Sequence, residues 1–178
     1  VEIETGRAIR RVALPAELFG EGLAKTGDRL IQLTWQEQRA LVWDLATLQR
    51  TGEHVYRGEG WGLTGDGERL FQSDGSHRLR LRDPESFAEV GMLAVHDGGR
   101  PVSALNELEW AGGRIYANLW MVDEIAVIDP ETGQLVARID ASGLLSPAER
   151  IRADVLNGIA WDPDRELFYL TGNYWPKL

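Results

Sequence analysis

Four segments of the chain share one pattern of hydrophobic and polar positions. Each has a short motif, then a loop with acidic residues, and then a run in which β-forming residues predominate; they are residues 20–33, 60–73, 106–118 and 157–170. The equivalent aliphatic residues Leu23, Leu63, Leu108 and Ile159 are 40, 45 and 51 residues apart. A period of this size with several short strands in each unit is typical of a β-propeller.

Further strands follow in each repeat. Residues 40–44, 79–83 and 125–129 alternate in part between apolar and polar positions, as a half-buried strand does. Asp83-Pro84-Glu85-Ser86 and Asp129-Pro130-Glu131-Thr132-Gly133 are turn sequences, because Pro presets φ and Gly tolerates positive φ. Residues 134–139 then form a fourth strand. The sequence therefore predicts an all-β fold of four-stranded antiparallel blades.

The two ends of the chain suggest an open ring. Residues 3–7 resemble the turn at 129–134, so we expect residues 1–4 to be a strand and the chain to begin at the third strand of a blade. Counting then gives one propeller domain over residues 1–178, a fragment with a half blade, three whole blades and another half blade. An open ring leaves sheet edges bare, which favours association. One short helix is expected from a capping box at Ser146, through about Arg152.

Composition excludes several classes of function. The chain has 19 Lys and Arg against 28 Asp and Glu, a formal net charge of −9, which disfavours a nucleic-acid partner. The absence of Cys excludes disulfides, thiolate metal sites and a Cys nucleophile. No apolar run approaches the roughly 20 residues that would span a bilayer, and no signal segment is visible. His54, His77 and His96 are scattered over different repeats and predict neither a metal set nor a catalytic triad.

Candidate chemistry gathers at the entries to the first strand of each repeat, which line the axis of a propeller. Glu21, Trp61, Asn106 and Asn157 occupy equivalent or nearly equivalent positions there. An alternative interpretation is that these positions hold turn residues and solvated charges. One carboxylate, two carboxamides and several indoles at one mouth would instead form a ligand pocket.

The seven Trp residues divide into two groups. Trp35, Trp61 and Trp120 fall at or beside strand ends, where indole walls could hold a small, partly apolar ligand, a sugar ring or a cationic amine. Trp43, Trp110 and Trp161 fit packing between blades, which is also the alternative for the first group. Lys177, beyond Trp175-Pro176, is a residue of the kind that is usually solvated.

Six ordered motifs resemble the plant and bacterial type of glutaminyl-peptide cyclotransferase, also called glutamine cyclotransferase. They span essentially the whole chain: Phe19-Gly20-Glu21-Gly22-Leu23, Glu59-Gly60-Trp61-Gly62-Leu63-Thr64, Leu105-Asn106-Glu107-Leu108-Glu109-Trp110, Ala117-Asn118-Leu119-Trp120, Leu156-Asn157-Gly158-Ile159-Ala160-Trp161-Asp162 and Thr171-Gly172-Asn173-Tyr174-Trp175-Pro176-Lys177. One such motif is weak evidence, whereas the ordered set is strong.

The resemblance implies a five-bladed β-propeller that converts an N-terminal glutaminyl residue to pyroglutamyl with release of ammonia. It matches the family's catalytic Glu to Glu21, its pocket Asn to Asn106 and its pocket Lys to Lys177. It matches the pocket Trp residues to Trp35, Trp61 and Trp120. Peptides or proteins with N-terminal Gln would be the substrates, no cofactor or metal is expected, and the family is generally exported, which suggests a periplasmic or secreted protein.

Chemistry gives these residues roles. Glu21 would carry a proton from the substrate's α-amine to its leaving amide nitrogen, with a pKa raised by the neighbouring indoles. Asn106 and Lys177 would donate hydrogen bonds to the oxyanion of the tetrahedral intermediate. Two other functions remain open: a non-enzymatic propeller that binds carbohydrate or peptide at the Trp-lined mouth, and a structural propeller that uses an outer face.

Overall fold

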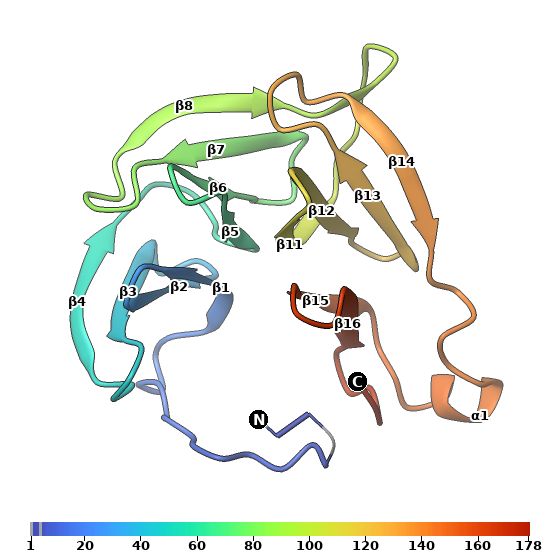
Figure 1. Ribbon diagram of the computed structural model, residues 1–178, viewed down its shortest axis with the longest axis horizontal. Helices are drawn as coiled ribbons and strands as arrows, with labels where there is room; N and C mark the ends of the chain where they lie inside the picture. Colours follow the sequence, from blue (N-terminus) through green and yellow to red (C-terminus); the bar gives the residue numbers. More distant parts are fainter. Residues whose placement is uncertain (1, 4) are drawn as a thin grey trace.

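Antiparallel sheets are arranged around a central axis in the computed structural model, which describes residues 2–3 and 5–178 (Figure 1). The first blade is β1 (Gly20–Thr26), β2 (Arg29–Thr34), β3 (Arg39–Asp44) and β4 (Arg50–Val55). The second is β5 (Leu63–Gly65), β6 (Leu70–Gln72), β7 (Arg78–Arg82) and β8 (Glu89–Ala94). The third is β11 (Leu105–Ala111), β12 (Arg114–Leu119), β13 (Glu124–Ile128) and β14 (Leu135–Asp140).

Strand order within each blade follows the chain, as in a propeller. A further antiparallel pair, β15 (Leu156–Asp162) and β16 (Leu167–Gly172), begins the next blade, and a small ribbon of β9 (His96–Asp97) and β10 (Arg100–Pro101) follows β8. The strands β1, β5, β11 and β15 lie innermost, and β4, β8 and β14 lie outermost (Figure 1). The predicted all-β propeller of four-stranded antiparallel blades is confirmed.

The beginning of the chain differs from the prediction. Glu2 N donates to Arg7 O at 2.9 Å and Gly6 N to Glu2 O at 2.8 Å, which is the turn seen again where Asp129 N donates to Gln134 O. Residues 2–3 and 5–19 nevertheless contain no strand, because no neighbouring strand pairs with either side of this turn. Val1 and Glu4, in the predicted first strand, lie outside the described residues. The predicted turn is present and the predicted strand pairing is not.

The hydrophobic core lies between blades and not within one. Ile31, Leu33, Leu63 and Phe87 belong to a buried cluster shared by the first two blades. A larger cluster joins the second and third blades, and a third one joins the third blade to β15 and β16. Both faces of a blade are therefore covered, which explains why the strands alternate only in part.

The three Trp residues assigned to packing all contact other hydrophobic side chains. Trp110 of β11 stacks on Phe71 of β6, with ring centroids 5.9 Å apart and planes 9° apart. Trp161 contacts Phe168, which in turn contacts Tyr116 of the third blade at the same centroid distance of 4.6 Å. Trp43 packs with Leu18, from the segment that precedes β1. The interpretation of packing between blades is confirmed for Trp110, whereas the ring contact of Trp161 lies within its own pair of strands.

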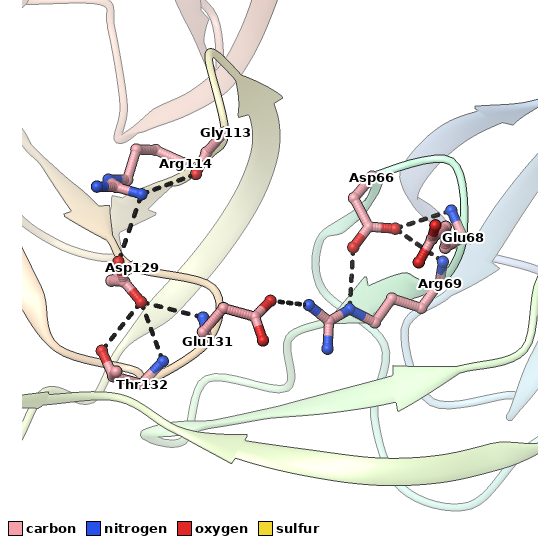
Figure 2. Close-up of polar contacts among 8 residues, drawn as sticks. All are labelled: Asp66, Glu68, Arg69, Gly113, Arg114, Asp129, Glu131 and Thr132. Carbon is pink, nitrogen blue, oxygen red and sulfur yellow. Dashed lines mark hydrogen bonds and ion pairs between the residues drawn. The ribbon is translucent and has the colours of Figure 1, made fainter.

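In the first two repeats, an Arg at the start of the second strand makes an ion pair with the next blade. Arg69, at the β5–β6 turn, pairs with Glu131 in the β13–β14 turn of the next blade, and Asp66 holds the Arg69 Nε at 2.9 Å (Figure 2). Arg29 makes the same contact one blade earlier, with Glu85 at 2.5 Å. Partly exposed pairs of this kind contribute at most about 1 kcal/mol each, so they align blades that hydrophobic burial holds together.

The predicted helix is confirmed as α1 (Pro147–Arg150), between β14 and β15. Ser146 N donates to Glu149 Oε2 at 2.8 Å and Glu149 N donates to Ser146 Oγ at 3.4 Å, which completes the capping box. No helix among the described residues is long and apolar enough to cross a membrane.

Candidate active site

A β-bulge opens three of the four inner strands and sets the position of the candidate residues. The register shifts between Gly20 and Leu23 in β1, and it shifts at the same point in β11 and β15. The residue two positions before the repeat's aliphatic residue is thereby turned out of the ladder, as bulges do. These residues are Glu21, Asn106 and Asn157, and Trp61 stands at the same offset immediately before β5.

All four side chains line one cavity of about 250 Å³. Its walls are Phe19, Glu21, Trp35, Trp61, Asn106, Trp120, Val155, Asn157 and Asn173. Five of the six predicted site residues are therefore brought together; the sixth, Lys177, is not among them. The predicted convergence of one carboxylate, two carboxamides and several indoles is present.

Aromatic rings form the walls of this cavity. Trp61 and Trp120 meet edge to face, with ring centroids 5.5 Å apart and planes 76° apart. Trp35 meets Phe19 in the same way at 6.0 Å. These residues come from three blades and from the segment before β1, so the cavity exists only when the blades are assembled. Such walls bind a flat, partly apolar group and exclude water.

Glu21 is a carboxylate without a counter-charge. Burial raises its pKa from 4.5 to about 7. Among the described residues its carboxylate has no hydrogen-bond or ion-pair partner, so desolvation acts alone. A carboxyl group with a pKa near 7 is present in both protonation states at neutral pH and can both accept and donate a proton.

Asn106 is held by its main chain while its amide is left available. The residue is only 5 % exposed, and Ser73 Oγ donates to its main-chain O at 2.6 Å. Its side-chain amide has no hydrogen-bond partner within the part of the chain that the structure describes. A fixed, unpaired amide N–H at a cavity wall is suited to stabilise developing negative charge.

Glu107 lies beside this site and was not assigned a role from the sequence. It follows Asn106 in the bulge, at the position where the other three repeats have Gly22, Gly62 and Gly158. A Cβ on Gly62 would come within 2.2 Å of Asn106 O, so these inner strands approach too closely for a second side chain. Burial, with smaller contributions from the charges of Glu21 and Glu109, raises the pKa of Glu107 to about 8.

This raised pKa predicts how stability depends on pH. The unfolded chain releases the Glu107 proton near pH 4.5, whereas the folded chain keeps it to about pH 8, so folding stability falls as pH rises between these values. Because Glu107 is partly exposed, we expect a loss of about 2 kcal/mol, less than the full shift implies at 1.36 kcal/mol per unit. Glu107→Gln should flatten this decline in urea unfolding at pH 5 and pH 8. Equal declines in both proteins would contradict an elevated pKa.

Lys177 lies outside the cavity of Glu21 and Asn106. Its Nζ donates to Glu149 Oε2 at 3.0 Å, and it lines a separate hollow with Trp175 and Phe168. The capping contacts with Ser146, followed by the ion pair with Lys177, lower the pKa of Glu149 to about 2, so the carboxylate stays charged at neutral pH. The donor role predicted for Lys177 requires this contact to open, because in the structure the ammonium group does not line the cavity of Glu21 and Asn106.

Sequence reasoning missed part of the lining. Phe19, Val155 and Asn173 all face the cavity but had no predicted role. Phe19 and Asn173 lie inside the ordered motifs, which was a usable signal. Val155 precedes β15 and carries no chemical signal in the sequence. Among the described residues, no group of three His, Asp or Glu side chains is arranged to hold a metal ion.

Fold and cavity together define a β-propeller with an indole-walled cavity that contains the carboxyl group of Glu21. A family model described as glutamine cyclotransferase matches residues 1–178. The chain belongs to the glutamine cyclotransferase family.

Individual relatives agree with this assignment. A glutaminyl-peptide cyclotransferase of Arabidopsis thaliana is 39 % identical over 183 residues, which cover 100 % of this chain and 57 % of the relative. The chain thus spans little more than half the length of this curated relative. The crystal structure of Myxococcus xanthus glutaminyl cyclase has a TM-score of 0.85 and 43 % identity, covering 90 % of this chain and 71 % of that one.

A more distant structure supports the fold alone. The Cps50 (Swd1) β-propeller domain of Myceliophteria thermophila has a TM-score of 0.57 at 13 % identity, covering 86 % of this chain and 49 % of that one.

Proposed function

We propose that the cavity binds the N-terminal glutaminyl residue of a peptide or protein and catalyses its conversion to pyroglutamyl with release of ammonia. The observation that carries this proposal is the uncompensated carboxylate of Glu21, with its pKa raised to about 7, in a cavity walled by Trp35, Trp61 and Trp120. Membership of the family and the identity to the Arabidopsis relative support the same reaction.

The reaction places both reacting groups in one residue. The α-amine nitrogen attacks the γ-carboxamide carbon, a C–N bond forms, and a tetrahedral intermediate carries negative charge on the former amide oxygen. That intermediate collapses, the C–NH₂ bond breaks and ammonia leaves. Indole walls that hold the side chain folded back on its own amine would supply much of the rate through proximity.

Glu21 serves as the proton carrier in this scheme. Its carboxylate takes a proton from the attacking nitrogen and returns it to the leaving nitrogen, so that the proton count balances over the cycle. Asn106 donates its amide N–H to the oxyanion. The scheme asks no metal or cofactor of these residues, and periplasmic or secreted localisation remains a prediction from the family.

Ammonia release tests the function. A short peptide that begins with Gln should yield ammonia and a pyroglutamyl product, whereas its N-acetylated form should yield neither because the nucleophile is blocked. Binding of both peptides without ammonia release would instead support the non-enzymatic propeller that binds at its Trp-lined mouth.

Lys177 is proposed as a second donor to the oxyanion, after its ammonium group leaves Glu149. We expect Lys177→Ala to lower kcat by about 10-fold or more, in the direction measured for lost oxyanion donors. Steady-state ammonia release measures the effect, and Lys25→Ala, on β1 away from the cavity, is a suitable control. Unchanged turnover would leave Lys177 only its contact with Glu149.

A further inference from the structure

One carboxylate joins two walls of the cavity. Glu59 Oε2 accepts a hydrogen bond from Trp35 Nε1 and another from Trp61 Nε1, each at 2.9 Å. Its second oxygen accepts from Gln36 Nε2 at 3.0 Å. Trp35 follows β2 in the first blade and Trp61 leads into β5 of the second, so the carboxylate bridges two blades at the mouth of the site.

We propose that Glu59 is a positioning residue for the glutaminyl-peptide site, and that its carboxylate fixes the indoles of Trp35 and Trp61 in the orientation that receives the substrate side chain. The inference rests on the proposed function, since it concerns the geometry of that site. Glu59 itself does not line the cavity, so its action is through the two indoles.

The two indoles depend on Glu59 to different degrees. Trp61 is also held by its edge-to-face contact with Trp120 and lies against Gly75. Trp35 is 40 % exposed and has Phe19, itself exposed, as its ring neighbour. A hydrogen bond to a charged acceptor is roughly twice as strong as a neutral one. Through its two hydrogen bonds, Glu59 therefore fixes the more exposed Trp35 relative to the better-packed Trp61.

The main chain beneath Glu59 is rigid. Gly60 N donates to Trp35 O at 2.9 Å, and a Cβ at Gly60 would lie 2.2 Å from the Tyr56 hydroxyl, so the chain passes here without room for a side chain. Gln72 Nε2 donates to Glu59 O at 3.2 Å, and Arg82 Nε donates to Gln72 Oε1 at 2.8 Å.

Gln72 and Arg82, which support the main chain of Glu59, are both buried. Arg82 is 4 % exposed and lies over the rings of Tyr56 and Phe87, while Gln72 is 0 % exposed. Buried, hydrogen-bonded groups of this kind hold one arrangement, because any other would leave a polar group unpaired. The Glu59 carboxylate is thus presented from a fixed base.

Its charge is also secured. The hydrogen bonds from Trp61, Gln36 and Trp35 lower the pKa of Glu59 below 4.5, so the carboxylate stays ionised across the neutral range. These hydrogen bonds are therefore fully present when the pH is above the ordinary pKa of Glu. They weaken only when the pH falls through the lowered pKa of Glu59.

Two variants and a matched control test the inference. Glu59→Ala removes all three contacts, and Glu59→Gln keeps the shape with one acceptor oxygen. Glu68→Gln, at the exposed β5–β6 turn, makes the same charge change away from the site. Indole N–H signals in ¹H–¹⁵N NMR spectra, assigned with Trp35→Phe and Trp61→Phe, report directly on the hydrogen bonds from these indoles to Glu59. Ammonia release from a Gln-peptide gives kcat and KM.

We expect Glu59→Ala to move the signals of Trp35 and Trp61 and to raise KM by about 10-fold, with kcat changed by less than about 3-fold, because the indole contacts that are lost hold the substrate equally in the ground state and in the transition state. Glu59→Gln should show a smaller change in both readouts, and Glu68→Gln neither. The other indole signals report that the variants are folded.

The outcomes separate the two proposals. Ammonia release with unmoved indole signals, or with moved signals and an unchanged KM, would overturn the role of Glu59 and leave the function standing. Absence of ammonia release from the unaltered protein would overturn the proposed function and with it the role of Glu59.

Discussion

Glu21→Gln is expected to lower kcat for ammonia release by about 1,000-fold, within the range of roughly 100 to 10,000 that general acid–base catalysis supplies. Gln has the shape of Glu but cannot take a proton from the attacking amine or return it to the leaving nitrogen. The cavity walls do not change, so the affinity for a Gln-peptide should stay within about 3-fold.

Both quantities can be measured on one preparation. Ammonia release gives turnover, and calorimetric titration with a Gln-peptide gives binding by the inactive variant. Glu17→Gln is the matched control, because Glu17 is exposed four residues earlier in the chain. Turnover within 10-fold of the unaltered protein would remove Glu21 from proton transfer.

The raised pKa gives the same prediction a pH signature. The carboxylate of Glu21 is the form that accepts the proton, and its pKa is about 7. The rate kcat/KM should therefore rise with pH through about 7 until a second group limits it. A profile already flat between pH 5 and pH 8 would show that Glu21 ionises near its ordinary value.

Periodicity explains why so much of the fold was predictable. Each repeat buries its strands against the next, so apolar residues recur at the same offsets and mark the blades. The residues two positions before Leu23, Leu63, Leu108 and Ile159 were also predicted to line one cavity. A bulge in β1, β11 and β15 turns three of these side chains out of the ladder. Glu21, Asn106 and Asn157 lie on strands, whose positions the repeat determines.

Positions off the repeat were less predictable. The position of the Lys177 ammonium group depends on the competing carboxylate of Glu149, which no periodicity describes. The role of Glu59 depends on indole orientations in two different loops. The strand expected at residues 1–4 failed where it is described, because a turn sequence alone cannot specify a pairing partner.

Asn106→Ala is expected to lower kcat by about 100- to 1,000-fold, the usual consequence of losing one donor to an oxyanion. The main-chain contact from Ser73 to Asn106 does not involve the amide, so the inner strand should keep its position. Asn106→Asp keeps the shape and replaces the donor by a negative charge beside the developing oxyanion.

The Asp variant should consequently lose at least as much kcat as the Ala variant, although it preserves packing better. That order separates donation from packing, since a purely structural Asn106 would make Asp the milder change. Stopped assays of ammonia release on both variants measure it. An Asp variant within 10-fold of the unaltered protein would show that Asn106 stabilises no negative charge, and the oxyanion would then need Lys177 as its donor.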